Sequence, residues 1–113
     1  MQIDKIMVAE LEELLGAERL TAQYQRLLAD LDQAMAEMAP LLPQGPSAEI
    51  AQKAHKVAGG AAILGLLDLS ASLRACQEAA QTDNAAALAQ HIATLPQHRA
   101  DLASFLHNRE TAA

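Results

Sequence analysis

The sequence has few aromatic residues and no tryptophan. Of its 113 residues, Phe, Trp and Tyr make up only 2%, although 51% of the residues are hydrophobic. The core must therefore be built from aliphatic side chains, and Ala and Leu, which dominate here, are strong helix formers. No segment alternates apolar and polar residues with β-branched enrichment, as a half-buried strand does. These absences predict an all-α fold.

Excess positive charge, disulfide partners and long apolar runs are also lacking. The formal net charge is −6, which argues against nucleic acid or an anionic membrane as a partner. Cys76 is the single cysteine and has no partner for an internal disulfide, so a reducing compartment fits best. No apolar run is long enough to span a bilayer, and no signal-peptide pattern is present. We therefore expect a cytoplasmic protein that uses neither a membrane nor nucleic acid.

Apolar residues recur at three- and four-residue steps in five segments, which predicts five helices. Asp4 is a candidate N-cap of a short first helix, and Gly16 is placed to end it. After a breaker-rich connector at Pro40–Pro46, Asp68 is a candidate N-cap of the fourth helix. The later helices are expected at about residues 17–39, 49–65, 69–81 and 85–109. Four long helices with short links predict an antiparallel four-helix bundle, with the short extra helix at one end and one domain over residues 1–113.

The third predicted helix places a histidine on a cleared outer face. On a helical projection its core-facing stripe contains five apolar residues, Ile50, Ala54, Val57, Ala61 and Leu64. His55 lies about 140° from the middle of that stripe and therefore points to solvent. The residues around it are small or polar: Gln52, Gly59 and Ala62, with Ala51 and Ala58 on one flank and Ile63 on the other.

Two adjacent glycines add to this pattern. Gly59 and Gly60 lie inside the helix, where each costs about 1 kcal/mol relative to alanine. Gly59 follows His55 by one turn on the same face, so its missing side chain leaves room for an approaching group. We interpret His55 as a reactive histidine that a partner's active site must reach. The plain alternative is a surface histidine beside a flexible point of the helix.

The turn after this helix predicts a neighbour for the imidazole. His55 lies eleven residues before Leu66 and Gln77 lies eleven residues after it. Residues equally far from a hairpin turn lie at similar heights on two antiparallel helices. Gln77 is therefore a candidate hydrogen-bond partner of His55, the alternative being an ordinary solvated glutamine.

The segment from His55 to Gly65 resembles the signature of histidine-containing phosphotransfer (HPt) domains. In that family a phosphorylatable histidine is followed by glycine four and ten residues later, as in His55-Lys-Val-Ala-Gly-Gly-Ala-Ala-Ile-Leu-Gly65. Ala54 fits as the preceding residue, and Leu11–Gly16 fits as the stretch that leads into a long helix. The similarity extends over essentially the whole chain in the order and length of the helices.

This resemblance implies a phosphorelay intermediate without a kinase site of its own. His55 would accept a phosphoryl group from a receiver-domain aspartate or hybrid kinase and pass it to another receiver domain. The partners implied are response-regulator receiver domains and a sensor or hybrid histidine kinase, with Mg²⁺ supplied by the receiver and no cofactor in this chain, which we expect to be a monomer. The phosphate-supporting residues would be Lys56, Gln77 and Gly59. The docking surface would consist of Gln52, Gly59, Ala62, Ile63 and Leu66.

One position departs from the family pattern. A lysine that assists the phosphoryl group commonly precedes the first glycine, and here that residue is Ala58. Lys56 and Lys53 lie about 100° and 160° around the helix from His55, so Lys56 is the better placed substitute. This departure gives weight to a second hypothesis, a helical adaptor or inhibitor that docks receiver or kinase domains without accepting phosphate.

A third hypothesis, a metal or cofactor bundle, rests on the last helix. His91, His98 and His107 share it, but no E-x-x-H pattern supplies carboxylates that would converge on them. We expect no metal site.

Overall fold

The computed structural model of the chain describes residues 1–42 and 47–111. In these residues the elements are α1 (Lys5–Leu15), α2 (Ala17–Met38), the 3₁₀ turn η1 (Ala39–Leu41), α3 (Ser47–Ile63), α4 (Leu67–Gln81) and α5 (Ala85–Thr111). The described part of the chain has no strand and one isolated bridge, between Ile3 and Leu66. The all-α prediction is confirmed. Of the predicted connector, residues 43–46 lie outside the described residues.

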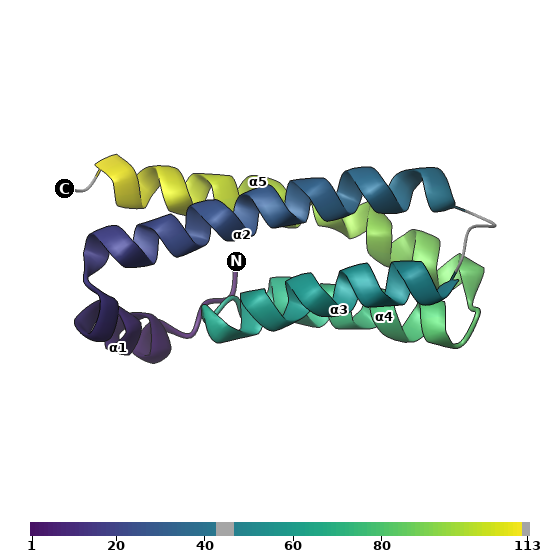
Figure 1. The fold of residues 1–113 in the computed structure, drawn as a ribbon, viewed down its shortest axis with the longest axis horizontal. Helices are drawn as coiled ribbons and strands as arrows, with labels where there is room; N and C mark the ends of the chain where they lie inside the picture. Colours follow the sequence, from purple (N-terminus) through teal and green to yellow (C-terminus); the bar gives the residue numbers. More distant parts are fainter. Residues whose placement is uncertain (43–46, 112–113) are drawn as a thin grey trace.

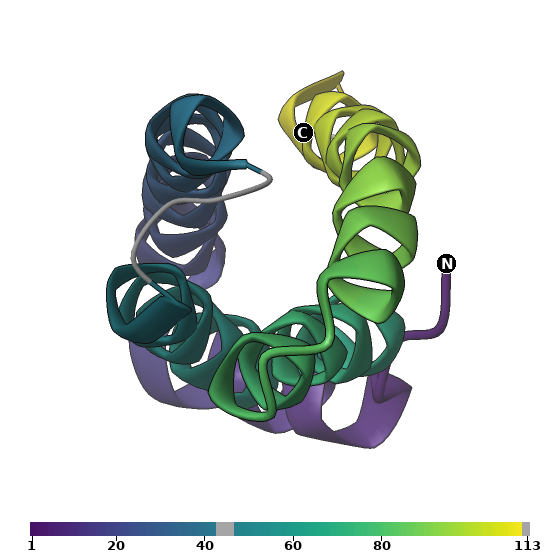
Figure 2. The same ribbon diagram turned by 90° about the vertical axis from the view of Figure 1, so that its right-hand side faces the viewer.

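The four long helices form an antiparallel bundle. Viewed along its length, α2, α3, α4 and α5 follow one another around a shared core (Figure 2). Each packs against two neighbours, α2 and α4 both contacting α3 and α5. The short α1 lies at the end of the bundle where α3 turns into α4 (Figure 1). This is the predicted architecture, drawn out to 45 × 21 × 19 Å.

The core is aliphatic apart from one buried tyrosine. The Tyr24 hydroxyl donates a hydrogen bond to the Leu64 carbonyl at 2.8 Å, and burial raises the pKa of this phenol. The Phe105 ring meets the Tyr24 ring edge-on at 4.9 Å between centroids. Cys76 is a packed core side chain, and burial raises the pKa of its thiol to about 11. Tyr24 thus links α2 to the end of α3, next to the α3–α4 turn.

Polar contacts fix the ends of the first helix. The Asp4 carboxylate accepts a hydrogen bond from the Met7 N–H at 3.0 Å, so the predicted N-cap is confirmed. Gly16 ends α1 with φ +83°, a conformation that favours glycine. The Asp4 N–H donates to the Gly65 carbonyl at 2.8 Å, which holds the segment before α1 against the α3–α4 turn.

Two helix boundaries differ from the sequence prediction. α4 begins at Leu67, two residues before the predicted start at Leu69, and Asp68 lies inside its first turn instead of capping it. α5 continues beyond Arg109 to Thr111, and it passes through Pro96 without ending, as predicted. None of the described helices combines the length and apolar character needed to cross a membrane.

Candidate functional site

His55 stands on the outer face of α3, as its position on the helical projection predicts. The five residues of the predicted core stripe are all buried, whereas the His55 side chain is exposed. An opening at the surface beside it is lined by Gln52, Lys53, His55 and Lys56. The imidazole is therefore accessible to a macromolecular partner.

The structure brings Gln77 of α4 to His55, as the hairpin register predicts. The His55 Nδ1 and the Gln77 Oε1 lie 3.2 Å apart. A carboxamide oxygen only accepts hydrogen bonds, so with this oxygen facing Nδ1 the contact favours the neutral tautomer that has its proton on Nδ1. The Nε2 atom of this tautomer then carries the lone pair.

The two central glycines have different surroundings. A Cβ atom added at Gly59 would meet no heavy atom within 4 Å, so this position is open space beside His55. A Cβ atom at Gly60 would lie 3.4 Å from the Leu27 Cδ1, because Gly60 faces α2. Gly59 thus leaves the outer face flat, and Gly60 belongs to the packing of α3 on α2.

The predicted docking residues are exposed or partly exposed up to the end of α3, but the one beyond the helix is buried. Gln52 is exposed, Ala62 is partly exposed and Ile63 is 68% exposed. The prediction for Leu66 is wrong, because this side chain is 0% exposed and belongs to the core. The helix ends at Ile63, and Gly65, with φ +79°, turns the chain so that Leu66 points inward. Leu67, which is partly exposed, is the apolar side chain that reaches the surface beyond the turn.

This difference in burial predicts that truncating Leu66 lowers the stability of the fold much more than truncating Ile63. Leu66→Ala should lower the free energy of unfolding by about 2–5 kcal/mol, because it removes a fully buried side chain. Ile63→Ala should change that free energy by about 0.5 kcal/mol or less, since its side chain is mostly exposed. Urea unfolding followed by circular dichroism measures both. Equal losses in the two variants would contradict the burial of Leu66.

Ala51 and Ala58 are not on the outer face. Both are buried, Ala58 with 1% exposure, so the predicted flank of the histidine face belongs to the interior. The Ala58 carbonyl accepts a hydrogen bond from the Ser70 Oγ of α4 at 3.3 Å. The Arg74 Nε donates in turn to the Ser70 Oγ at 3.3 Å.

The sequence motif did not identify Ser70 and Arg74. They precede Gln77 by seven and three residues, the spacing of side chains on one face of a helix. That spacing is the signal that could have placed them on the same face of α4 as Gln77.

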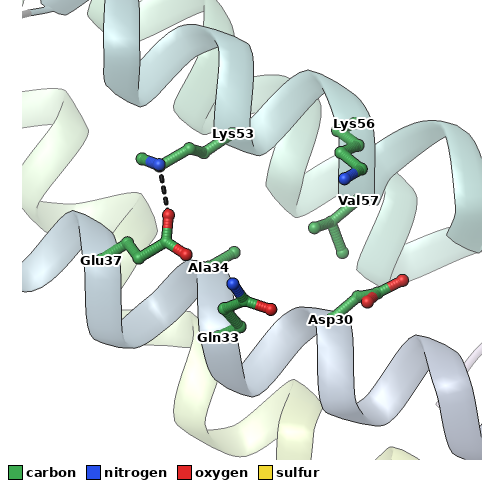
Figure 3. A pocket seen from close by; sticks show the side chains of 7 residues that line it. All are labelled: Asp30, Gln33, Ala34, Glu37, Lys53, Lys56 and Val57. Atoms are coloured by element: carbon green, nitrogen blue, oxygen red, sulfur yellow. Dashed lines mark hydrogen bonds and ion pairs between the residues drawn. The ribbon is translucent and has the colours of Figure 1, made fainter.

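The lysines of α3 border the opening at His55 and also face α2. A groove between α2 and α3 has Lys53 and Glu37 at one end and Lys56 and Asp30 at the other (Figure 3). Lys53 forms an ion pair with Glu37, and this hydrogen bond raises the pKa of Lys53 and lowers that of Glu37. Lys53 also lies 3.7 Å from the Glu49 carboxylate. Lys56 borders both this groove and the opening at His55.

The other histidines do not form a metal centre in the described residues. His98 is held by a 2.9 Å contact between its Nε2 and the Ser72 Oγ. Among residues 1–42 and 47–111, no three His, Cys, Asp or Glu residues cluster closely enough to hold a metal ion.

Comparison with known proteins assigns the chain to a family. No curated protein and no solved structure gives a significant match. Residues 18–106 match the family model described as the Hpt domain, and this range includes His55, Gln77 and most of the bundle. Members of this family are phosphotransfer modules of two-component signalling, without a kinase site of their own, that interact with receiver domains and histidine kinases. The match covers most of the chain, and the chain therefore belongs to the Hpt domain family.

Proposed function

We propose that this protein is a phosphorelay intermediate in which His55 carries the phosphoryl group. It accepts the group from a receiver-domain aspartyl phosphate or a hybrid kinase and passes it to a second receiver domain. The observation that supports this most strongly is the exposed imidazole whose Nδ1 rests on Gln77, leaving Nε2 free. A nucleophile for an in-line transfer needs such an unblocked lone pair.

The transfer step follows from this arrangement. The Nε2 lone pair attacks phosphorus, the P–N bond forms, and the P–O bond to the receiver aspartate breaks, its electron pair leaving with the carboxylate. The ring then carries the Nδ1 proton facing Gln77 and the phosphoryl group on Nε2. On transfer to the second receiver, the P–N bond breaks and its electrons return to Nε2. With Nδ1 still protonated, the leaving group is a neutral imidazole, which departs more readily than an anion.

The partner completes the site in this proposal. The receiver supplies Mg²⁺ and its own lysine, because phosphoryl transfer depends on positioning and charge neutralisation. It docks on the face formed by Gln52, Gly59, Ala62 and Ile63, where Ile63 contributes exposed apolar surface. A patch of this small size suits a transient encounter. We propose that it meets these partners in the cytoplasm and acts there as a monomer.

The experiment that tests this function is phosphotransfer from a panel of phosphorylated receiver domains. We expect at least one receiver to transfer label to the protein within minutes, in a bond that is labile to acid and stable to base. If several receivers bind and none transfers label, the proposal is wrong and the chain is a docking adaptor. The alanine at position 58, where the family pattern has lysine, is the observation that favours this second function.

A further inference from the structure

Ala58 leaves the histidine face without the lysine that the family pattern places there, and α4 offers a cation in its place. We propose that the Arg74 guanidinium of α4 binds the phosphoryl group once it is attached to His55. This inference rests on the proposed function, because it assigns a second residue to the same site.

A chain of two hydrogen bonds fixes the base of this guanidinium beside Ala58. The Arg74 Nε donates to the Ser70 Oγ at 3.3 Å, and the Ser70 Oγ donates to the Ala58 carbonyl at 3.3 Å. Ser70 is only 5% exposed, so this anchor is part of the packed α3–α4 interface. Ser70 thus links Arg74 of α4 to the backbone of α3 at Ala58, the position where the family pattern has a lysine.

The register of the hairpin places Arg74 one turn from the level of His55. Ala58 follows His55 by three residues on α3, and Arg74 precedes Gln77 by three residues on α4. Because the two helices are antiparallel, both steps lead in the same direction along the hairpin, toward the turn. Arg74 thus lies one helical turn, about 5 Å, from Gln77 along α4, and Ser70 lies one turn farther from His55. The Arg74 side chain is long and exposed, and it binds the phosphoryl group in this proposal by turning from Ser70 toward Gln77.

The guanidinium is available for an anion. Among the described residues only the bond to Ser70 involves Arg74, and no carboxylate there lies within ion-pair distance of it. The terminal nitrogens therefore keep their donors for a phosphate, whose oxygens they match as a two-pronged fork. Lys53 is already paired with Glu37. Lys56 borders the opening at His55 and also faces Asp30 across the α2–α3 groove (Figure 3), so it is the competing cation that the test separates from Arg74.

Two measurable consequences follow from a cation at this place. Cleavage of the P–N bond by water proceeds through the protonated ring, and a nearby guanidinium opposes that protonation, so the phosphohistidine should live longer. The same charge favours the dianionic phosphoryl group and should lower the pKa of its last proton.

The test labels the full chain with phosphoramidate, so that no receiver is required. The donor's P–N bond breaks with release of ammonia as the bond from phosphorus to the His55 Nε2 forms. We compare the wild type with Arg74→Gln, Arg74→Lys and Lys56→Gln, and with Arg19→Gln as a control at an exposed arginine of α2. Phosphohistidine half-life and the ³¹P titration midpoint of the phosphoryl group are measured, with circular dichroism as the check on folding.

Arg74→Gln should shorten the half-life about fivefold or more, as expected for loss of a charge-assisted hydrogen bond, and should raise the ³¹P midpoint. Arg74→Lys should give a half-life and a ³¹P midpoint between those of Arg74→Gln and the wild type. Arg19→Gln should change neither the half-life nor the midpoint. The inference is overturned if Arg74→Gln matches the wild type, or if Lys56→Gln alone produces the whole effect. If neither phosphoramidate nor any receiver labels the wild type at His55, the proposed function itself fails. Labelling that is insensitive to Arg74 overturns only this inference.

Discussion

Replacing His55 with glutamine should abolish phosphorylation and leave the fold intact. Glutamine keeps a polar side chain of helical propensity at this exposed position but has no ring nitrogen to form the P–N bond. We expect label from phosphorylated receivers to fall at least about 100-fold, to the background of the assay, because the variant lacks the nucleophile. The free energy of unfolding should change by about 0.5 kcal/mol or less, as at other exposed positions.

The matched control for this variant is His107→Gln. His107 is also an exposed helical histidine, but it lies on α5 and outside the α3–α4 hairpin. It should accept label at the wild-type rate. Labelling of His55→Gln at more than a few per cent of wild type would show that another residue carries the phosphate.

Filling the open space at Gly59 should block transfer from receivers while leaving the histidine reactive. Gly59→Leu places a branched side chain where a partner must approach, and its Cβ would meet no heavy atom of the described residues outside the local helix backbone within 4 Å. Since displacing reacting groups by about 1 Å can cost about 100-fold in rate, we expect a loss of that order in transfer from a receiver. Phosphoramidate is small enough to pass the new side chain, so its reaction with His55 should change little.

Two variants separate docking from folding in this experiment. Gly60→Ala makes an ordinary contact with Leu27 on the α2 side and should not slow transfer. Ala100→Leu adds the same bulk to an exposed position of α5, with no effect expected. Equal rates for Gly59→Leu and the wild type would mean that the receiver approaches from another face.

The sequence was enough to predict the buried stripe of α3 and the exposure of His55, because the helical period relates these side chains to one another. The projection that buries Ile50 and Ala61 necessarily exposes His55, and the structure agrees. The contact with Gln77 could be predicted as well, since it depends only on counting residues from the turn. The family match over residues 18–106 agrees with the resemblance carried by the histidine and the two glycines.

Leu66 and Ala58 could not be placed correctly from the same periodicity. The projection assumes that a helix continues, but α3 ends at Ile63 and the positive φ of Gly65 redirects the chain. Whether Ala58 is exposed depends on how closely α4 packs against α3, which a single helix does not determine. The Ser70–Ala58 and Arg74–Ser70 contacts depend on the rotation of α4 about its own axis, so the motif on α3 gives no sign of them.

The most direct test of the central claim is to identify the phosphorylated atom. Correlation of ³¹P with ¹⁵N in the labelled protein reports which imidazole nitrogen carries phosphorus. The Nδ1–Gln77 contact predicts coupling to the Nε2 of His55. Coupling to its Nδ1, or to His91, His98 or His107, would contradict the account.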